Sequence, residues 1–249
     1  MQGAGSRPPA AGEDSTPACL EPPGPLEIQA DSRQARAAPV TPVSASPTTL
    51  VASNRPLVGV LALQGDFEAH GKMLRSLGAD VREVRVPADL AGLDGLVIPG
   101  GESTTMTLGV AREGLAGPLR ELAGRGTPVL GTCAGMIMLD RAHLGIAGWT
   151  CERNAFGRQV RSFETDLEID GIDGEPVRAM FIRAPWIADH DEDVEILADV
   201  DGHPVAARQG DVLAVAFHPE LTGEPRVHEL FLRMVRDRSS GALRTAHFP

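Results

Sequence analysis

Two short segments of the chain contain the residue types of a cysteine-based acyl-transfer site. Cys133 stands in the pentapeptide Gly131-Thr-Cys-Ala-Gly135 after an apolar run, and His218-Pro-Glu220 follows a second apolar run later in the chain. A thiol attacks an acyl carbon only as the thiolate, so it needs a base to take its proton and a third group to orient that base. Cys133, His218 and Glu220 therefore predict a Cys-His-Glu catalytic triad.

The cysteine must be held at a tight turn between a strand and a helix. Residues 128–131 predict a buried strand that leads straight into Cys133, and the apolar residues 136–139 predict the helix after it. Flanking glycines tolerate the backbone angles of such a nucleophile elbow. The start of the helix favours a thiolate, and its free backbone N–H groups, such as that of Ala134, can bind an oxyanion. Taken alone, Cys133 would be a small buried apolar residue in a turn, but its pairing with His218 and Glu220 favours the catalytic interpretation.

A second glycine-rich segment, Pro99-Gly-Gly-Glu-Ser103, follows another expected strand over residues 93–98. Here the N–H of Gly101 is the candidate for a second oxyanion donor. The alternative is an ordinary turn whose helix is capped by Ser103 or Thr104. A phosphate-binding loop is disfavoured because no Gly-Lys-Ser/Thr sequence follows.

The elements that carry these segments follow the pattern of an α/β domain with a mainly parallel sheet. From residue 57 onward, short apolar runs alternate with longer amphipathic ones. The first half predicts strands over residues 57–63, 81–86, 93–98 and 128–131, with one helix over 67–77 and another from Thr104 or Thr105 through Leu122. The second half predicts strands over residues 159–169, 177–182, 194–198, 204–207 and 212–217, pairing in a more antiparallel way, and a last amphipathic helix that ends near Val235.

Composition divides the chain of 249 residues unevenly. Nine of its 20 prolines fall within the first 55 residues, where no apolar periodicity occurs. We therefore expect a disordered Pro/Ala-rich extension over residues 1–55, one compact domain over 56–238 and a flexible tail over 239–249.

Charge and cysteine content exclude several classes of function. A net charge of −11 without a cluster of Lys and Arg argues against nucleic-acid binding. The sequence contains no run of about 18 apolar residues, the length that would indicate a membrane-spanning helix. The three cysteines are an odd number and lack metal-ligand spacing, and a chain of this size needs no disulfide scaffold, so a reducing cytoplasm fits best. We expect no metal and no cofactor.

Taken in their order along the chain, several segments of this sequence resemble those of one family, the glutaminase subunits of pyridoxal 5'-phosphate synthase. These subunits are class I, triad-type glutamine amidotransferases. The resemblance runs from about residue 58 to residue 235. The matching segments are Gly59-Val-Leu-Ala-Leu-Gln-Gly65, Pro99-Gly-Gly-Glu-Ser-Thr-Thr105, Gly131-Thr-Cys-Ala-Gly135, Glu152-Arg-Asn-Ala-Phe-Gly-Arg-Gln159, Phe181-Ile-Arg-Ala-Pro185 and Phe217-His-Pro-Glu-Leu-Thr222. The fourth and fifth of these segments are specific to the family, whereas the cysteine and histidine motifs belong to the wider amidotransferase class.

The resemblance implies a flavodoxin-like three-layer sandwich and a role for each matching residue. Cys133 would be the nucleophile, His218 the general base and acid, and Glu220 the residue that orients the imidazole. The oxyanion donors would be Gly101 and Ala134. The family's glutamine contacts fall on Gly101, Glu102, Ser103, Arg153, Ile182 and Arg183. The resemblance therefore implies hydrolysis of L-glutamine to L-glutamate and ammonia through a glutamyl thioester.

The resemblance also implies a partner, a separate (β/α)8-barrel synthase subunit that uses the ammonia, in a large heteromeric complex. Glutaminases of this kind are near-inactive until the synthase docks and orders the oxyanion peptide, which a Gly100-Gly101 hinge would permit. The chain between Cys133 and Arg153 is shorter than is usual in the family. The alternatives are a glutaminase subunit of another class I amidotransferase, such as one of histidine biosynthesis, a γ-glutamyl hydrolase, or a catalytically silent binding partner with the same fold.

Overall fold

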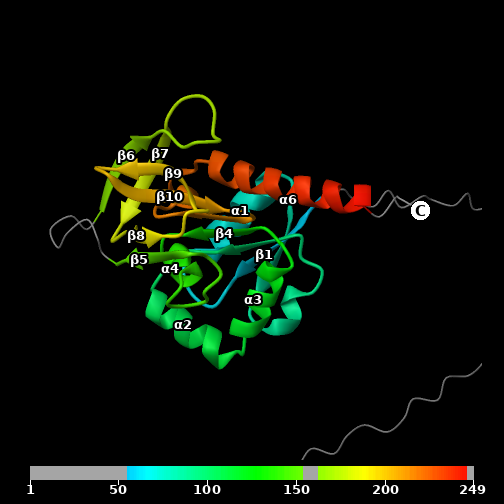
Figure 1. Ribbon diagram of the computed structural model, residues 1–249. Helices are drawn as coiled ribbons and strands as arrows, with labels where there is room; N and C mark the ends of the chain where they lie inside the picture. The colour runs from blue at the N-terminus through cyan, green and yellow to red at the C-terminus, as the bar shows by residue number, and fades with distance from the viewer. Residues whose placement is uncertain (1–54, 154–161, 246–249) are drawn as a thin grey trace, which may run out of the picture. The chain divides into compact units, whose positions relative to one another are not determined.

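The computed structural model describes residues 55–153 and 162–245 (Figure 1). The extension expected over residues 1–55 lies outside this part of the chain except for Arg55. The start of the strand expected from residue 159, and most of the family-specific segment 152–159, also lie outside it.

A seven-stranded sheet forms the centre of the described fold, in the order β2-β1-β3-β4-β11-β10-β9 (Figure 1). The first five strands of this order are parallel to one another, whereas β10 pairs in an antiparallel way with both β11 and β9. In sheet order the strands are β2 (Asp80–Val84), β1 (Leu57–Leu61), β3 (Gly95–Ile98), β4 (Val129–Thr132), β11 (Val212–Val215), β10 (His203–Gln209) and β9 (Glu195–Val200). The parallel strands follow the 2-1-3-4-5 order of flavodoxin-like folds, which confirms the predicted fold class.

Helices cover both faces of the sheet and complete the three layers. On one side lie α1 (Phe67–Ser76) and the long C-terminal helix α6 (Arg226–Thr245), and on the other side lie α2 (Ser103–Arg112), α3 (Ala116–Gly124) and α4 (Ala134–Leu139) (Figure 1). A short helix, α5 (Pro219–Thr222), follows β11, and a 3-10 helix, η1 (Pro87–Leu90), follows β2.

The central strands are apolar throughout because they are buried on both faces. Every residue of β3, β4 and β11 is buried. Strands covered by helices on both sides are expected to be continuous apolar runs rather than alternating ones. This is why the apolar runs before Pro99 and Cys133 predicted strands, and the parallel pairing brings the ends of these strands to the same edge of the sheet.

Two smaller antiparallel sheets extend the second half of the described chain. In one, β5 (Trp149–Glu152) pairs with β8 (Trp186–His190), and in the other, β6 (Ser162–Leu167) pairs with β7 (Val177–Ile182). The antiparallel character expected here is therefore correct, and β7 has the predicted bounds. The sequence analysis did not predict β5 and β8; β8 shows no clear alternation of apolar and polar residues.

Two predicted helix boundaries are wrong. The helix expected from Thr104 through Leu122 is two helices, because Gly114, with φ of +66°, turns the chain between α2 and α3. The last helix does not end near Val235 but continues to Thr245, so the domain boundary expected at residue 238 falls inside α6. The alternative considered for the glycine-rich segment was a turn whose helix is capped by Ser103 or Thr104, but the side chain of Glu102 caps α2.

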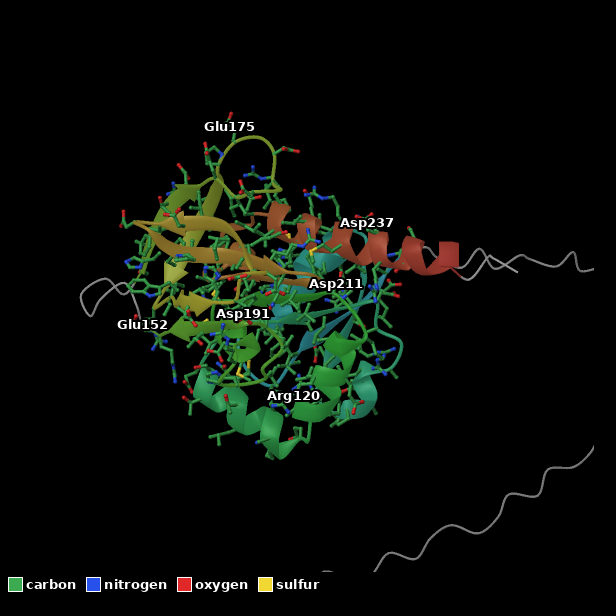
Figure 2. All side chains as sticks on the ribbon, in the orientation of Figure 1. Arg120, Glu152, Glu175, Asp191, Asp211 and Asp237 are labelled. Atoms are coloured by element: carbon green, nitrogen blue, oxygen red, sulfur yellow. The ribbon has the colours of Figure 1, made fainter. Side chains whose placement is uncertain are left out.

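In the part of the chain that the structure describes, the acidic side chains of Asp140 and Glu220 are buried, and most other charged side chains lie at the surface. Figure 2 labels six charged residues from different parts of the chain: Arg120, Glu152, Glu175, Asp191, Asp211 and Asp237. Among the described residues, no helix is both long enough and apolar enough to cross a membrane.

Candidate active site

Neighbouring parallel strands bring Cys133 and His218 together. Thr132 at the end of β4 pairs with Val215 at the end of β11, and the N–H of Cys133 donates to the carbonyl of Val215 at 2.8 Å. The N–H of His218 donates to the carbonyl of Met180 in β7 at 2.9 Å. Both side chains therefore lie at the carboxyl edge of the sheet, where parallel α/β folds bind ligands.

Cys133 has the strained backbone of a nucleophile elbow. Its φ and ψ are 47° and −108°, outside the usual regions for a residue with a side chain. The two flanking glycines leave no space for a Cβ atom: one at Gly131 would lie 2.6 Å from Leu139 Cδ1, and one at Gly135 would meet the carbonyl oxygen of Ile98. The predicted elbow is therefore present, with β4 before it and α4 after it.

His218 is held between Cys133 and Glu220. Its Nδ1 lies 2.7 Å from Glu220 Oε1, and the two side chains are 7% and 0% exposed. Burial opposes a positive charge on the ring, but hydrogen bonds with Cys133 and Glu220 outweigh that effect and raise the pKa of His218 to about 10. At neutral pH the imidazole therefore carries a proton on both nitrogens.

Gly100 lies directly against this pair, a contact that the sequence analysis did not foresee. A Cβ at Gly100 would lie 3.0 Å from His218 Nδ1 and 3.3 Å from Cys133 Cβ, and closer still to His218 Cε1. The carbonyl of Gly100 packs against Gly65, in the turn after β1. In a trans peptide the N–H points opposite to the carbonyl, so the N–H of Gly101 is directed away from Gly65.

Gln64 and Glu102 shape the glycine-rich segment beyond Gly101. The N–H of Glu102 donates to Gln64 Oε1 at 2.7 Å. The carboxylate of Glu102 caps α2, accepting from the N–H groups of Thr104 at 3.0 Å and Thr105 at 2.7 Å. The side-chain hydrogen bond from Thr105, followed by the two backbone bonds, lowers the pKa of Glu102 to about 2, so this carboxylate is ionised. A helix start is where such a charge is most favourable.

Arg153 reaches the same corner from its place directly after β5. Its Nη2 lies 3.5 Å from Glu102 Oε1 and 3.3 Å from Thr104 Oγ1. The Arg153 and Glu102 side chains are 47% and 45% exposed, so this ion pair is weak and readily exchanged for another partner.

Ile182 and Arg183 approach the cysteine from the end of β7. The sulfur of Cys133 lies 3.9 Å from the carbonyl oxygen of Ile182. Arg183 has a φ of 46°, a conformation uncommon for a residue with a long side chain. Strained residues of this kind cluster at functional sites, and here two of them, Cys133 and Arg183, line the same cavity.

The cavity has a volume of about 390 Å³, within the usual range for small-molecule sites. It contains every predicted site residue except Glu220, which is buried behind His218. Its lining is Gln64, Asp66, Gly101, Glu102, Ser103, Cys133, Ala134, Ile137, Arg153, Ile182, Arg183 and His218. The sequence analysis missed Gln64, Asp66 and Ile137. The signal for the first two was their position directly after the first strand, at the same sheet edge as the glycine-rich segment.

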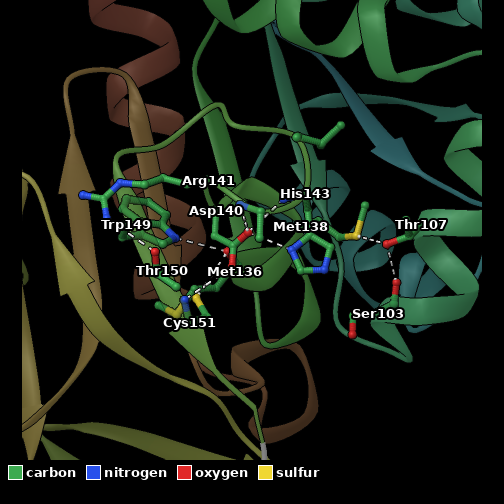
Figure 3. A network of polar contacts seen from close by, with 12 residues as sticks. Ser103, Thr107, Met136, Met138, Asp140, Arg141, His143, Trp149, Thr150 and Cys151 are labelled. Carbon is green, nitrogen blue, oxygen red and sulfur yellow. Dashed lines mark hydrogen bonds and ion pairs between the residues drawn. The ribbon is translucent and has the colours of Figure 1, made fainter.

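A network of polar contacts joins α4 to the segments that follow it (Figure 3). Asp140, 1% exposed, accepts from the N–H of Cys151 at 3.3 Å and lies 2.7 Å from His143 Nδ1. The indole N–H of Trp149 donates to the carbonyl of Met136 in α4 at 3.2 Å. These contacts attach β5 to α4 and thereby fix where the chain leaves β5. Burial, together with the charge of Asp140, raises the pKa of Cys151, so this second cysteine is a structural thiol.

One group of side chains at the site has the composition of a metal site. Asp66, His218 and Glu220 offer ligand atoms within 4.8 Å of one another. A metal there would have to replace the 2.7 Å hydrogen bond between His218 and Glu220, and Asp66 Oδ2 stands 3.9 Å from the same Nδ1. The 2.7 Å separation of His218 Nδ1 and Glu220 Oε1 is that of a direct hydrogen bond between the two side chains.

Comparisons with known proteins agree with this arrangement. The model of the SNO glutamine amidotransferase family matches residues 60–237. A pyridoxal 5'-phosphate synthase subunit PdxT of Mycobacteroides abscessus is 54% identical over 190 residues, covering 73% of this chain and 98% of the relative. The protein of the same name from Rhodococcus opacus is 52% identical over 198 residues, with the same two coverages.

Solved structures are similar as well. The crystal structure of a glutamine amidotransferase is 45% identical, has a TM-score of 0.67 and covers 72% of this chain and 98% of its own. The structure of a putative GMP synthase component from Thermoplasma acidophilum is 18% identical, has a TM-score of 0.58 and covers 75% of this chain and 96% of its own, which indicates a shared fold.

Proposed function

This chain belongs to the SNO glutamine amidotransferase family, and from that premise we propose that it hydrolyses L-glutamine to L-glutamate and ammonia as the glutaminase subunit of a pyridoxal 5'-phosphate synthase. The observation that carries the proposal is the arrangement of Cys133, His218 and Glu220 at the base of the cavity. The names of the similar proteins support the assignment to this synthase rather than to another amidotransferase.

In the proposed reaction the Cys133 thiolate attacks the carboxamide carbon of glutamine. The N–H groups of Gly101 and Ala134 hold the oxyanion that forms. Ala134 is the first residue of α4, where an N–H has no acceptor within the helix. Each such donor contributes about 2.7–4 kcal/mol of transition-state stabilisation.

His218 carries the protons through both halves of the reaction. Its imidazolium protonates the departing nitrogen, so ammonia leaves and a glutamyl thioester remains on Cys133. The neutral imidazole then takes a proton from water, which cleaves the thioester to glutamate. Glu220 keeps the ring in one orientation throughout, through the 2.7 Å contact at Nδ1. Thiolate chemistry of this kind suits the reducing cytoplasm, which we propose as the location.

Charged groups at the rim of the cavity suit an amino-acid substrate. We assign Arg153 to the α-carboxylate of glutamine, because a guanidinium binds carboxylates bidentately and the present contact with Glu102 is weak enough to exchange. Glu102 and the carbonyl of Ile182 are the candidates for the ammonium group, with Ser103 and Arg183 completing the contacts. The carboxylate of Glu102 would act here while still capping α2.

The released ammonia requires an acceptor, which we propose is a separate (β/α)8-barrel synthase subunit in a heteromeric complex. Docking of this subunit would order the Gly100-Gly101 peptide and so complete the oxyanion site. The close packing of Gly100 on His218 and Cys133 supports such control, since a small movement of this peptide changes the space around both catalytic groups.

The direct test is ammonia release from L-glutamine by the full-length chain, with and without the cognate synthase subunit. We expect activity that requires the synthase and is lost in Cys133→Ala. The matched variant Cys151→Ala, which removes the half-buried structural thiol, should retain it. Full activity of the isolated chain would refute the gating. Absence of ammonia in both conditions would refute glutamine hydrolysis and indicate a silent binding partner.

A further inference from the structure

Two buried histidines lie behind the triad, and the proposed reaction uses neither. His70 belongs to α1 and His228 to α6, and both residues are 0% exposed. Each stands on the buried face of its helix, with Leu74 one turn after His70 and Phe231 and Leu232 one turn after His228. These are positions at which a helix packed on a sheet normally places an apolar side chain.

The two imidazoles continue the chain of polar contacts that begins at Cys133. His70 Nε2 lies 3.4 Å from Glu220 Oε2 and 3.1 Å from Thr132 Oγ1. On the other side of the ring, His70 Nδ1 lies 2.8 Å from His228 Nε2. The order of groups from the cavity into the core is therefore Cys133, His218, Glu220, His70 and His228.

Both rings are neutral at physiological pH. Burial lowers the pKa of His70 well below its usual value, and the nearby His228 and His218 lower it further. Burial also lowers the pKa of His228 to about 4. Each ring therefore has one N–H donor and one acceptor nitrogen, and the hydrogen bonds of the ring decide which nitrogen carries the proton.

Two assignments of these protons are consistent with the contact between the rings, and only one of them places an N–H donor beside the buried carboxylate of Glu220. If His70 carried its proton on Nδ1, it would donate to His228 Nε2, and the N–H at His228 Nδ1 would have no acceptor. Glu220 Oε2, which has no hydrogen-bond partner among the described residues, would then face an unprotonated nitrogen 3.4 Å away. Leaving a buried carboxylate oxygen unpaired costs more than leaving a neutral ring nitrogen unpaired.

In the other assignment both histidines carry the proton on Nε2. His228 then donates to His70 Nδ1, and His70 Nε2–H faces Thr132 Oγ1 and Glu220 Oε2. In the described part of the chain, Glu220 Oε2 and His228 Nδ1 have no hydrogen-bond partner. This assignment leaves His228 Nδ1 without a proton and places an N–H donor 3.4 Å from Glu220 Oε2.

We propose that His70 is a positioning residue of the triad: its Nε2–H donates to Glu220 Oε2, and His228 fixes the tautomer of His70 that makes this bond possible. The proposal rests on the proposed function, because it assigns a role in the same reaction. With Oε1 held by His218 and Oε2 held by His70, the Glu220 carboxylate cannot rotate away while the charge on His218 changes. The 3.4 Å distance is long for a hydrogen bond, as is common before substrate binds, and we expect it to shorten during the reaction.

The first test observes the tautomers directly and does not depend on activity. In the full-length chain labelled with ¹⁵N-histidine, protonated and unprotonated ring nitrogens have distinct NMR shifts, and His70→Gln and His228→Gln identify the two sets of signals. We expect both rings to be neutral with the proton on Nε2. A proton on Nδ1 of His70 would refute the proposal.

The second test measures kinetics of the full-length chain with its synthase subunit. His70→Phe keeps a ring but removes both nitrogens, and we expect kcat to fall about 10- to 100-fold with KM within about threefold. His70→Gln places an amide donor near the position of Nε2, and we expect it to recover most of kcat. The matched control is His190→Gln, at an exposed position of β8.

The pattern of results separates this proposal from the proposed function. Wild-type kcat in His70→Phe, or equal losses in the Phe and Gln variants, would refute positioning by His70 while glutamine hydrolysis stands. Loss of thermal stability alone, without a change in kcat, would show that the pair serves only packing. If the wild type released no ammonia at all, the proposed function would fail, and the tautomer measurement would still decide whether His70 donates to Glu220.

Discussion

Gly100→Ala is the sharpest test of how closely the glycine-rich segment is fitted to the catalytic pair. The substitution changes no charge and no hydrogen bond, and φ at Gly100 is not in the left-handed region, so alanine suits the backbone. The added Cβ would nevertheless lie 3.0 Å from His218 Nδ1 and 3.3 Å from Cys133 Cβ, with His218 Cε1 nearer still. Carbon atoms in contact are normally about 3.5–4.0 Å apart.

The size of the effect follows from the movement that this overlap requires. Gly100 lies on the backbone after β3, whereas His218 is held at its Nδ1 by Glu220, so both sides resist displacement. Relief of the overlap by roughly 1 Å would misplace the imidazole relative to the sulfur, and a misplacement of that size costs about 100-fold in rate. Overpacking of this kind also lowers the free energy of unfolding by about 1–3 kcal/mol.

The assay is kcat for glutamine hydrolysis by the complex, read beside thermal denaturation. The matched control is Gly124→Ala in α3, where a Cβ would meet nothing within 4 Å and alanine is the better helix former. We expect the control to keep full activity and to be slightly more stable. A Gly100→Ala enzyme with kcat within twofold of the wild type would refute the contact between Gly100 and the catalytic pair.

Three further predictions concern single side chains. Arg153→Ala should raise KM for glutamine about 10- to 100-fold with kcat within about threefold, because it removes a charged hydrogen bond to the substrate. An unchanged KM in steady-state kinetics would show that Arg153 does not bind glutamine. The pKa of Glu102 is lowered from 4.5 to about 2, so its charge contributes stability that is present above pH 4.5 and lost as pH falls through 2. The difference in Tm between the wild type and Glu102→Gln should therefore shrink over that range, and a difference independent of pH would contradict the capping role of the charge. Iodoacetamide should alkylate Cys133 at least about 100-fold faster than Cys151, because burial and the charge of Asp140 raise the pKa of Cys151. Peptide mass spectrometry can measure the two rates, and equal rates would contradict the assignment of Cys151 as a structural thiol.

The local elements were predictable where neighbours in the sequence determine them. The apolar runs of β3, β4 and β11 are buried on both faces, which is a strong signal, and β7 was predicted to the residue. Prediction failed where one residue decides the outcome. Gly114 divides an apolar pattern that suits one continuous helix, and the polar end of α6 gives little sign of where the helix stops.

The candidate site was predictable to the extent that its residues lie in short motifs. Cys133, His218 and Glu220 are recognisable because each motif follows a buried strand, and parallel strands place their carboxyl ends at one edge. The roles of these residues, and of Arg153 and Arg183 in binding glutamine, stay predictions until the experiments above are done. Gln64 and Asp66 have no motif of their own, although their place after the first strand puts them at the same edge.

By itself the sequence determined the class of fold and the chemistry available at the sheet edge, because strand burial and turn conformation depend on residues close together in the chain. Tertiary structure alone decided the contacts between distant segments. The packing of Gly100 on His218 and the pairing of His70 with Glu220 depend on how the segment after β3 and helices α1 and α6 lie on the sheet. Helical periodicity predicts only that His70 and His228 face the core. It does not predict which buried group each ring will contact.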